Sequence, residues 1–72
     1  MDAGKTGAYL AALRKARGMT QQEAADQLGV SNKTVSKWEN GAGLPDITVL
    51  PALAELYGVT ADDILAGETL RG

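Results

Sequence analysis

The sequence contains no cysteine, no histidine and no phenylalanine. Without thiols or imidazoles, it cannot form a disulfide framework or a zinc finger, and we expect no metal or cofactor. Apolar residues never reach the ~18 consecutive positions of a membrane span, and no basic and then apolar leader opens the chain. These absences predict a cytoplasmic protein that has no membrane partner. They also make an enzyme the weakest hypothesis, because so short a chain offers little room for a substrate cleft and no small-molecule ligand is evident.

What remains is suited to one small helical domain. The chain has 72 residues, which is near the lower limit for a core without cross-links. Ala and Leu are frequent, and the alternation of apolar and polar residues that marks strands is missing. The sequence therefore predicts an all-α fold that comprises residues 1–72 as a single domain.

Apolar spacing, hydroxyl N-caps and glycine stops divide this domain into five helices. The predicted elements are a tail at 1–5, helices at 6–17, 20–28, 31–40, 48–57 and 60–66, and a tail at 67–72. Pro51 requires the fourth helix to start late or to bend. The residues predicted to face the core are Tyr9, Leu10, Leu13, Ala16, Ala24, Ala25, Leu28, Val35, Trp38, Leu50, Leu53, Ala54, Tyr57, Ile64 and Leu65.

The second and third helices are separated by a very short turn. Thr20 and Glu23 form a capping box at the start of the second helix, and Gly29 ends it. Ser31 then starts the third helix only two residues later. Two short helices joined so tightly cannot lie antiparallel, so the pattern predicts that they cross steeply, as in a helix-turn-helix.

The third helix, 31–40, has two chemically different faces. At 100° per residue, Asn32, Lys33, Ser36, Lys37 and Asn40 fall within an arc of roughly 140°, while Val35 and Trp38 lie opposite. The polar arc offers amides, a hydroxyl and two ammonium groups but no carboxylate, which suits the edges of DNA bases and the phosphates beside them. The alternative is an ordinary solvated helix face.

Charge is unevenly distributed along the chain. Residues 1–41 carry six Lys and Arg against four Asp and Glu, whereas residues 42–72 carry one against five. The net charge of −2 therefore hides a mildly basic half and an acidic half. Local sign matters more than the total for contact with a phosphate backbone, so DNA is not excluded.

Joint spacing over the chain resembles a known family. The positions of Gln21, Ala25, Gly29, Val35 and Trp38 are similar to the helix-turn-helix of the phage repressor and Cro-like regulators, the XRE family. The stretches 13–21, 35–41, 50–54 and 57–60 are also similar to that family. The resemblance implies a compact five-helix lambda-repressor-like domain that binds double-stranded DNA. It also implies a transcription regulator of the bacterial or phage type, associated with the nucleoid and acting as a homodimer on a near-palindromic operator.

The resemblance also implies roles for individual residues. Asn32, Lys33, Ser36 and Lys37 match the positions that contact base edges. Gln21 matches a residue that contacts a phosphate or anchors the recognition helix, and Asn40 matches a backbone-contacting position. The bland alternatives are a first-turn polar residue for Gln21 and a helix C-cap for Asn40.

A structural ion pair is implied as well. Arg14 and Glu39 resemble the family's pair that joins the first helix to the recognition helix. The alternative is two unrelated surface charges.

The loop at 41–46 departs from the family's pattern. Some phage members carry basic residues there, but this loop has none, and Asp46 is acidic. Dimerisation therefore becomes more important, with Leu65 and Leu70 of the fifth helix and its tail as the suggested surface and a frayed end as the alternative. A second function also stays open, in which the same fold acts as an antitoxin or anti-repressor that binds a protein through its acidic half.

Overall fold

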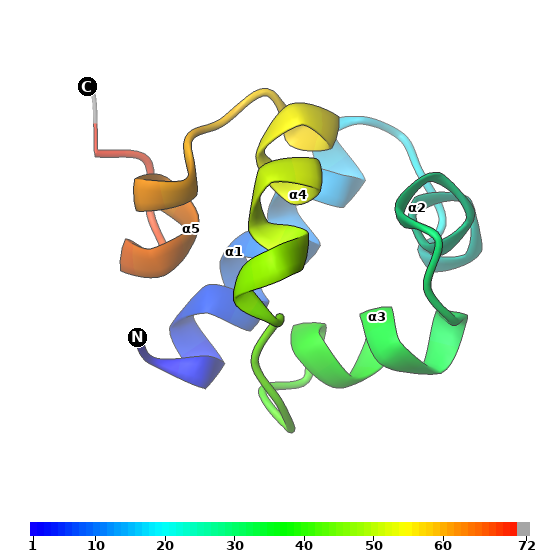
Figure 1. The fold of residues 1–72 in the computed structure, drawn as a ribbon, viewed down its shortest axis with the longest axis horizontal. Helices are drawn as coiled ribbons and strands as arrows, with labels where there is room; N and C mark the ends of the chain where they lie inside the picture. Colours follow the sequence, from blue (N-terminus) through cyan, green and yellow to red (C-terminus); the bar gives the residue numbers. More distant parts are fainter. Residues whose placement is uncertain (71–72) are drawn as a thin grey trace.

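Five α-helices form the structure, a computed structural model that describes residues 1–70 (Figure 1). They are α1 (Ala3–Ala16), α2 (Gln21–Leu28), α3 (Asn32–Glu39), α4 (Leu50–Tyr57) and α5 (Ala61–Ala66), with a 3-10 helix, η1 (Ile47–Val49), before α4. No strand occurs among these residues, and the predicted all-α class with five helices is confirmed. No helix within 1–70 combines the length and the apolar character needed to cross a bilayer.

Side-chain caps explain why the short helices begin where they do. The hydroxyls of Thr20, Ser31 and Thr60 accept hydrogen bonds from the backbone N–H groups three residues later, at 3.0, 3.1 and 3.0 Å. At Thr20 and Thr60 the third helical residue bonds back to the cap, which completes two capping boxes. The predicted starts at 20, 31 and 60 are therefore the caps of α2, α3 and α5.

The first helix begins earlier than predicted. The expected tail at 1–5 is wrong, because α1 starts at Ala3 and the Asp2 carboxylate caps it by accepting from the Lys5 N–H at 2.9 Å. Asp at an N-cap offsets the low helix propensity of the glycines that follow. The composition of this stretch resembles a tail, but the cap decides its conformation.

The fourth helix begins later than residue 48. Asp46 caps η1 through the Thr48 N–H at 2.9 Å, and the α-helix proper starts at Leu50. Pro51 lies in the first turn, where a missing N–H costs nothing. The late start is what the proline requires.

One apolar core lies where the helices meet. Its largest fully buried side chains include Leu10, Val35, Leu53 and Ile64, each at most 2% exposed. Two predicted core residues are wrong: Ala16 is exposed at the end of α1, and Leu65 is 39% exposed on α5. Both lie next to a helix end, where the apolar period alone does not fix which side is covered.

Residues 67–70, part of the predicted tail at 67–72, follow the end of α5 and contact the rest of the domain. The ammonium of Lys5 pairs with Glu68, and the hydroxyls of Tyr9 and Thr69 are 3.1 Å apart. The Leu70 N–H donates to the Asp63 carboxylate at 3.0 Å. Residues 71–72 of the predicted tail lie outside the described residues.

Candidate nucleic-acid interface

The turn between α2 and α3 makes the two helices cross. Gly29 has φ of 71°, a conformation that costs residues with a side chain, and the Val30 N–H still bonds to the Ala25 carbonyl at 3.0 Å. Ala24 and Ala25 are fully buried, and their small side chains allow close packing. In Figure 1, α3 runs along one edge of the molecule while α2 is seen nearly end-on. This is the geometry of a helix-turn-helix.

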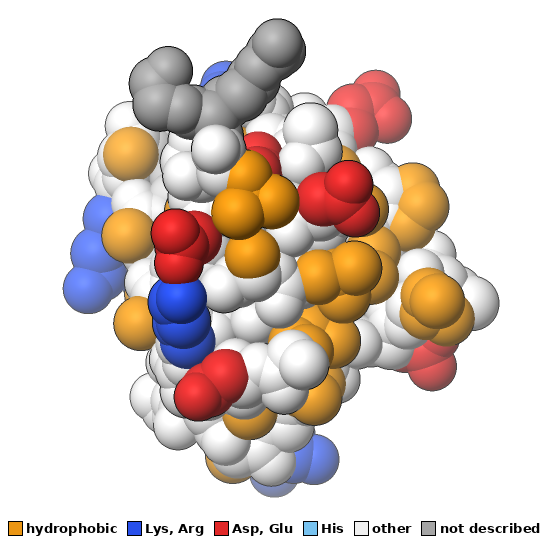
Figure 2. Space-filling model, turned by 90° about the vertical axis from the view of Figure 1, so that its left-hand side faces the viewer, with side chains coloured by type: hydrophobic (Ala, Val, Ile, Leu, Met, Phe, Trp, Pro, Cys, Tyr) orange, Lys and Arg blue, Asp and Glu red, His pale blue; other side chains and the backbone are white. Residues whose placement is uncertain are grey.

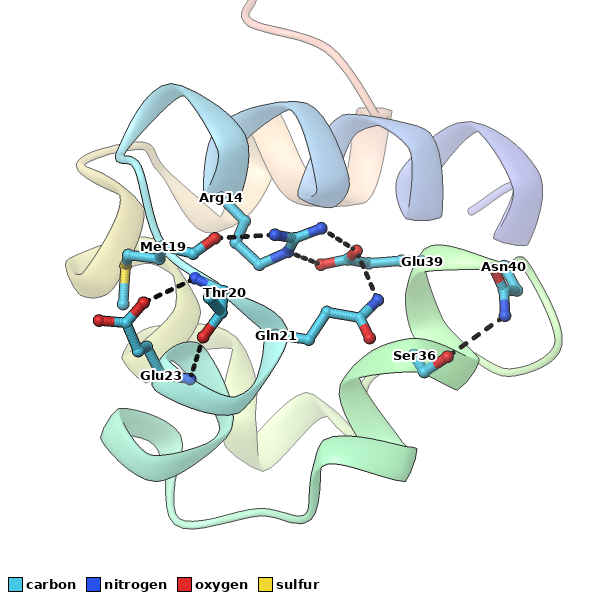
Figure 3. Close-up of polar contacts among 8 residues, drawn as sticks. All are labelled: Arg14, Met19, Thr20, Gln21, Glu23, Ser36, Glu39 and Asn40. Atoms are coloured by element: carbon cyan, nitrogen blue, oxygen red, sulfur yellow. Dashed lines mark hydrogen bonds and ion pairs between the residues drawn. The ribbon is translucent and has the colours of Figure 1, made fainter.

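An ion pair fixes α3 to α1. The Arg14 guanidinium donates from Nε and Nη2 to the two oxygens of Glu39, at 2.8 and 2.9 Å (Figure 3). Its third nitrogen, Nη1, donates to the Met19 carbonyl at 2.8 Å, beside the start of α2. The side chains of Arg14 and Glu39 are only 12% and 5% exposed, so this is not a pair of unrelated surface charges.

Gln21 joins the same cluster from α2. Its amide Nε2 donates to Glu39 Oε1 at 3.0 Å, so Glu39 receives donors from both neighbouring helices. Burial alone raises the pKa of Glu39, but the hydrogen bonds from Arg14 and Gln21 outweigh burial and hold this pKa below its ordinary value. Burial raises the pKa of the Tyr57 hydroxyl, and the negative charge of Glu39 raises this pKa further. The Gln21 contact supports its role as an anchor of α3.

A second contact between α1 and α3 escaped the sequence analysis. Gly7 is buried against the carbonyls of Trp38 and Glu39, and a side chain there would overlap the Trp38 oxygen. Close approach of α1 to the end of α3 therefore depends on a residue without Cβ. A glycine inside a helical pattern is the available signal for such packing, but the expected tail at 1–5 placed Gly7 at an end of the helix, where it attracts no notice.

The polar face of α3 stays open to solvent. Asn32, Lys33, Lys37 and Asn40 are exposed, and Ser36 is half-buried. The only carboxylate of α3, Glu39, is turned to the cluster and buried. The structure thus brings the five predicted residues to one surface and removes the negative charge from it.

Asn40 is the C-cap of α3. Its backbone N–H bonds to the Ser36 carbonyl at 2.9 Å, and its Nδ2 lies 3.4 Å from the Ser36 hydroxyl, a long contact (Figure 3). The cap role is satisfied by the backbone. The side-chain amide therefore keeps hydrogen-bonding capacity for another partner.

With this geometry defined, comparison with known proteins places the chain. A family model described as Helix-turn-helix matches residues 10–64. The chain belongs to the helix-turn-helix family of phage repressor and Cro-like regulators. It is 41% identical over 58 residues to the HTH-type transcriptional activator BcrR of Enterococcus faecalis, a match that covers 81% of this chain. It is 36% identical over 55 residues to the cryptic phage CTXphi transcriptional repressor RstR of Vibrio cholerae, covering 76% of this chain.

The fold is shared with solved structures of the same kind. The crystal structure of the clp gene regulator ClgR from Corynebacterium glutamicum superimposes with a TM-score of 0.82 at 25% identity, over 93% of this chain and 71% of that one. The names of these relatives describe regulators rather than enzymes. The chain spans 28% of the length of BcrR and 49% of that of RstR. It therefore corresponds to only a part of these relatives.

Proposed function

We propose that the protein is a sequence-specific transcriptional regulator that inserts α3 into the major groove of double-stranded DNA. One observation carries this proposal. The exposed face of α3 combines two lysines with two amides and a hydroxyl, while its carboxylate is held inside by Arg14 and Gln21. The names of two relatives, a transcriptional activator and a transcriptional repressor, support the same function. A DNA partner also fits the proposed cytoplasmic location at the nucleoid.

Within this proposal, the exposed side chains divide by role. Asn32, Lys33 and Ser36 lie on the first turns of α3, the part of a recognition helix that contacts base edges. A lysine donates to guanine O6 and N7. An asparagine pairs with adenine through its one side-chain amide, whose oxygen accepts from N6 and whose NH₂ donates to N7. Gln21 has one amide hydrogen on Glu39, and the second is available for a phosphate. Asn40, at the other end of α3, is the second proposed backbone contact.

The test is binding to a random duplex and to a selected duplex at several salt concentrations. Phosphate contacts release counterions, so the logarithm of the binding constant should fall steeply with the logarithm of salt concentration. Selection from a random duplex pool should return a near-palindromic consensus. A salt slope near zero would contradict DNA binding, and a flat selection would contradict base reading.

Gln21→Ala is the matched test of the backbone contacts. It should weaken binding by a similar factor on all sequences, because a phosphate carries no sequence information. Its melting temperature must be measured alongside, since the same variant also removes a bond to Glu39. A changed consensus would contradict the role given to Gln21.

We further propose that two copies bind together, with half-sites about one turn, roughly 34 Å, apart. Leu65 and Leu70 are 39% and 58% exposed on α5 and the segment after it. Figure 2 shows hydrophobic side chains at the surface on the side of the molecule that α5 occupies in Figure 1. Leu65→Ser should then lower the apparent affinity and the mass measured by sedimentation at the same concentration. If Leu65→Ser remained a dimer of the same mass, the two copies would have to pair through another surface.

A second function, binding to a protein partner, is supported by a groove on another part of the surface. A groove of about 400 Å³ opens between α2 and α4, lined by Gln27, Leu28, Ala52, Glu55 and Leu56. Glu55 is its only charged side chain, in keeping with the acidic half of the chain. An antitoxin or anti-repressor that uses this groove would bind a protein and not the random duplex, so the salt series on duplex DNA separates the two functions.

A further inference from the structure

The side chain of Lys37 runs from α3 past the loop that follows this helix. Its Cγ, Cδ and Cε atoms pass 4.0, 3.9 and 3.9 Å from the point where a Cβ of Gly43 would stand. The aliphatic stem therefore lies beside the loop that follows α3. The Cε atom, which carries the ammonium group, lies beside this loop.

The backbone conformation at residue 43 does not require a glycine. The glycines with positive φ are Gly18, Gly29, Gly41, Gly58 and Gly67, and Gly43 is not among them. What its missing side chain provides is room beside the lysine stem. An added Cβ would sit at ordinary contact distance, whereas a branched side chain would take the space that the stem occupies.

The loop has no positive charge of its own. Between Gly41 and Val49 the only ionisable side chain is Asp46, and its carboxylate is engaged with Thr48. Within residues 1–70 the ion pairs are Lys5–Glu68 and Arg14–Glu39, so no carboxylate of this part of the chain holds the Lys37 ammonium. Lys37 is therefore the one cation placed beside this loop by α3.

Position along the helix points the same way. Asn32 and Lys37 are five residues apart, which is about 7.5 Å along the axis of a helix. In helix-turn-helix complexes the bases are contacted from the N-terminal part of the recognition helix, while the flanking segments approach the backbone. A lysine near the C-terminal end, laid over the following loop, is suited to a phosphate.

We propose that Lys37 contacts a backbone phosphate instead of reading a base, and that Gly43 positions it. This inference rests on the proposed DNA binding and replaces the base-reading role that the sequence predicts for Lys37. It supplies the phosphate contact for which the loop has no residue. Base readout then belongs to Asn32, Lys33 and Ser36.

The first test compares Lys37→Ala with Lys33→Ala on a panel of duplexes that differ at single positions. Lys37→Ala should weaken binding by the same factor on every duplex and lower the salt slope by about 0.9, the value for one phosphate. Lys37→Arg should restore both quantities. Lys33→Ala should instead change the preferred base at one or two positions. Thermal unfolding followed through the single tryptophan, Trp38, should be unchanged in all of them.

The second test is a double-mutant cycle with Gly43. Gly43→Ala should bind like the wild type, because its Cβ would only touch the stem. Gly43→Val should lose part of the affinity that Lys37→Ala loses, and should add no loss when Lys37 is already alanine. Should Gly43→Val fold poorly, the comparison of Lys37→Ala with Lys33→Ala still decides the assignment.

Two results would overturn the inference, and they are distinct from a failure of DNA binding. A changed base preference in Lys37→Ala with an unaltered salt slope returns Lys37 to base reading. Additive losses from Gly43→Val and Lys37→Ala remove the positioning role of Gly43. A wild-type protein with a salt slope near zero would instead reject the proposed function itself, before any variant is compared.

Discussion

The domain has one half that carries α1, α2 and α3 and another that carries α4 and α5. Both halves are helical, but they are held by different contacts. In the first half, Arg14, Gln21 and Glu39 form one polar cluster across three helices. In the second half, Leu50, Leu53, Tyr57 and Ile64 pack into the core. The polar contacts that join this half to α1 are separate ones, a buried bond from the Thr6 hydroxyl to the Ile64 carbonyl and the exposed Lys5–Glu68 and Tyr9–Thr69 contacts. Polar contacts fix direction because their geometry is narrow, whereas apolar contacts fix mainly proximity. The half that carries the proposed DNA surface is the one in which a single hydrogen-bonded cluster joins three helices.

Removing the carboxylate at the centre of the cluster should have the largest effect. Glu39→Ala leaves the almost buried Arg14 without its carboxylate, with only the Met19 carbonyl as a partner. We expect a loss of about 4 kcal/mol in the free energy of unfolding, because breaking one side of a buried pair is costly. The measurement is the melting temperature. Glu55→Ala, which removes an exposed carboxylate from α4, is the matched control and should melt like the wild type. A wild-type melting temperature for Glu39→Ala would contradict the structural role of the pair.

Leu53→Ala tests the apolar half and should cost about 3 kcal/mol. Leu53 is 1% exposed, and Leu65→Ala at the surface is the control with the smaller expected loss.

The two halves should also differ in their response to acid. The pKa of Glu39 is lowered in the folded protein, so its stabilisation is present above the unfolded pKa, about 4.3, and is lost as pH falls through the lower folded value.

Denaturant titrations at several pH values can measure this difference between the two halves, because only the contribution of Glu39 should be lost in acid. The stability difference between wild type and Glu39→Ala should shrink as the pH falls below about 4, while the difference for Leu53→Ala should stay constant. Equal shrinkage in both variants would mean that acid weakens the whole domain rather than the polar cluster.

Lys33→Ala should separate function from stability. The side chain is exposed on α3, so the melting temperature should hold, while binding to the selected duplex should weaken by about 1–3 kcal/mol with a changed base preference. Lys5→Ala, which removes a cation of α1 paired with Glu68, is the control for simple loss of charge. Equal weakening by both variants on every duplex would make Lys33 a general electrostatic contributor.

The smallest effects are expected at the two matching capping boxes. Thr20→Ala and Thr60→Ala should each cost about 1 kcal/mol in stability. Thr20→Ala should weaken DNA binding beyond that loss, because its helix begins next to the Met19 carbonyl that Arg14 holds. Affinity measured well below both melting temperatures tests this. A binding defect in Thr60→Ala would show that α5 also takes part, as a dimer surface requires.

Sequence patterns were most informative where the signal is local. The helix starts at Thr20 and Thr60 and the turn at Gly29 are set by neighbouring residues, and each lies in the structure where the pattern predicts it. The Arg14–Glu39 pair was reached through resemblance, since 25 residues separate the two side chains and no local pattern joins them. The start of α1 was missed because a single Asp2 cap outweighs a glycine-containing stretch that looks like a tail.

By itself, the sequence determined the helical class, the order of the helices and the polar composition of the α3 face, because these depend on propensity, caps and periodicity within a few residues. Only the tertiary structure decided what each polar group does. It turned Glu39 inward onto Arg14 and Gln21, brought Gly7 against the Trp38 carbonyl, and laid the stem of Lys37 along Gly43. Such contacts join residues that are distant in sequence or lie on different elements, and their geometry is set by packing rather than by neighbours in the chain.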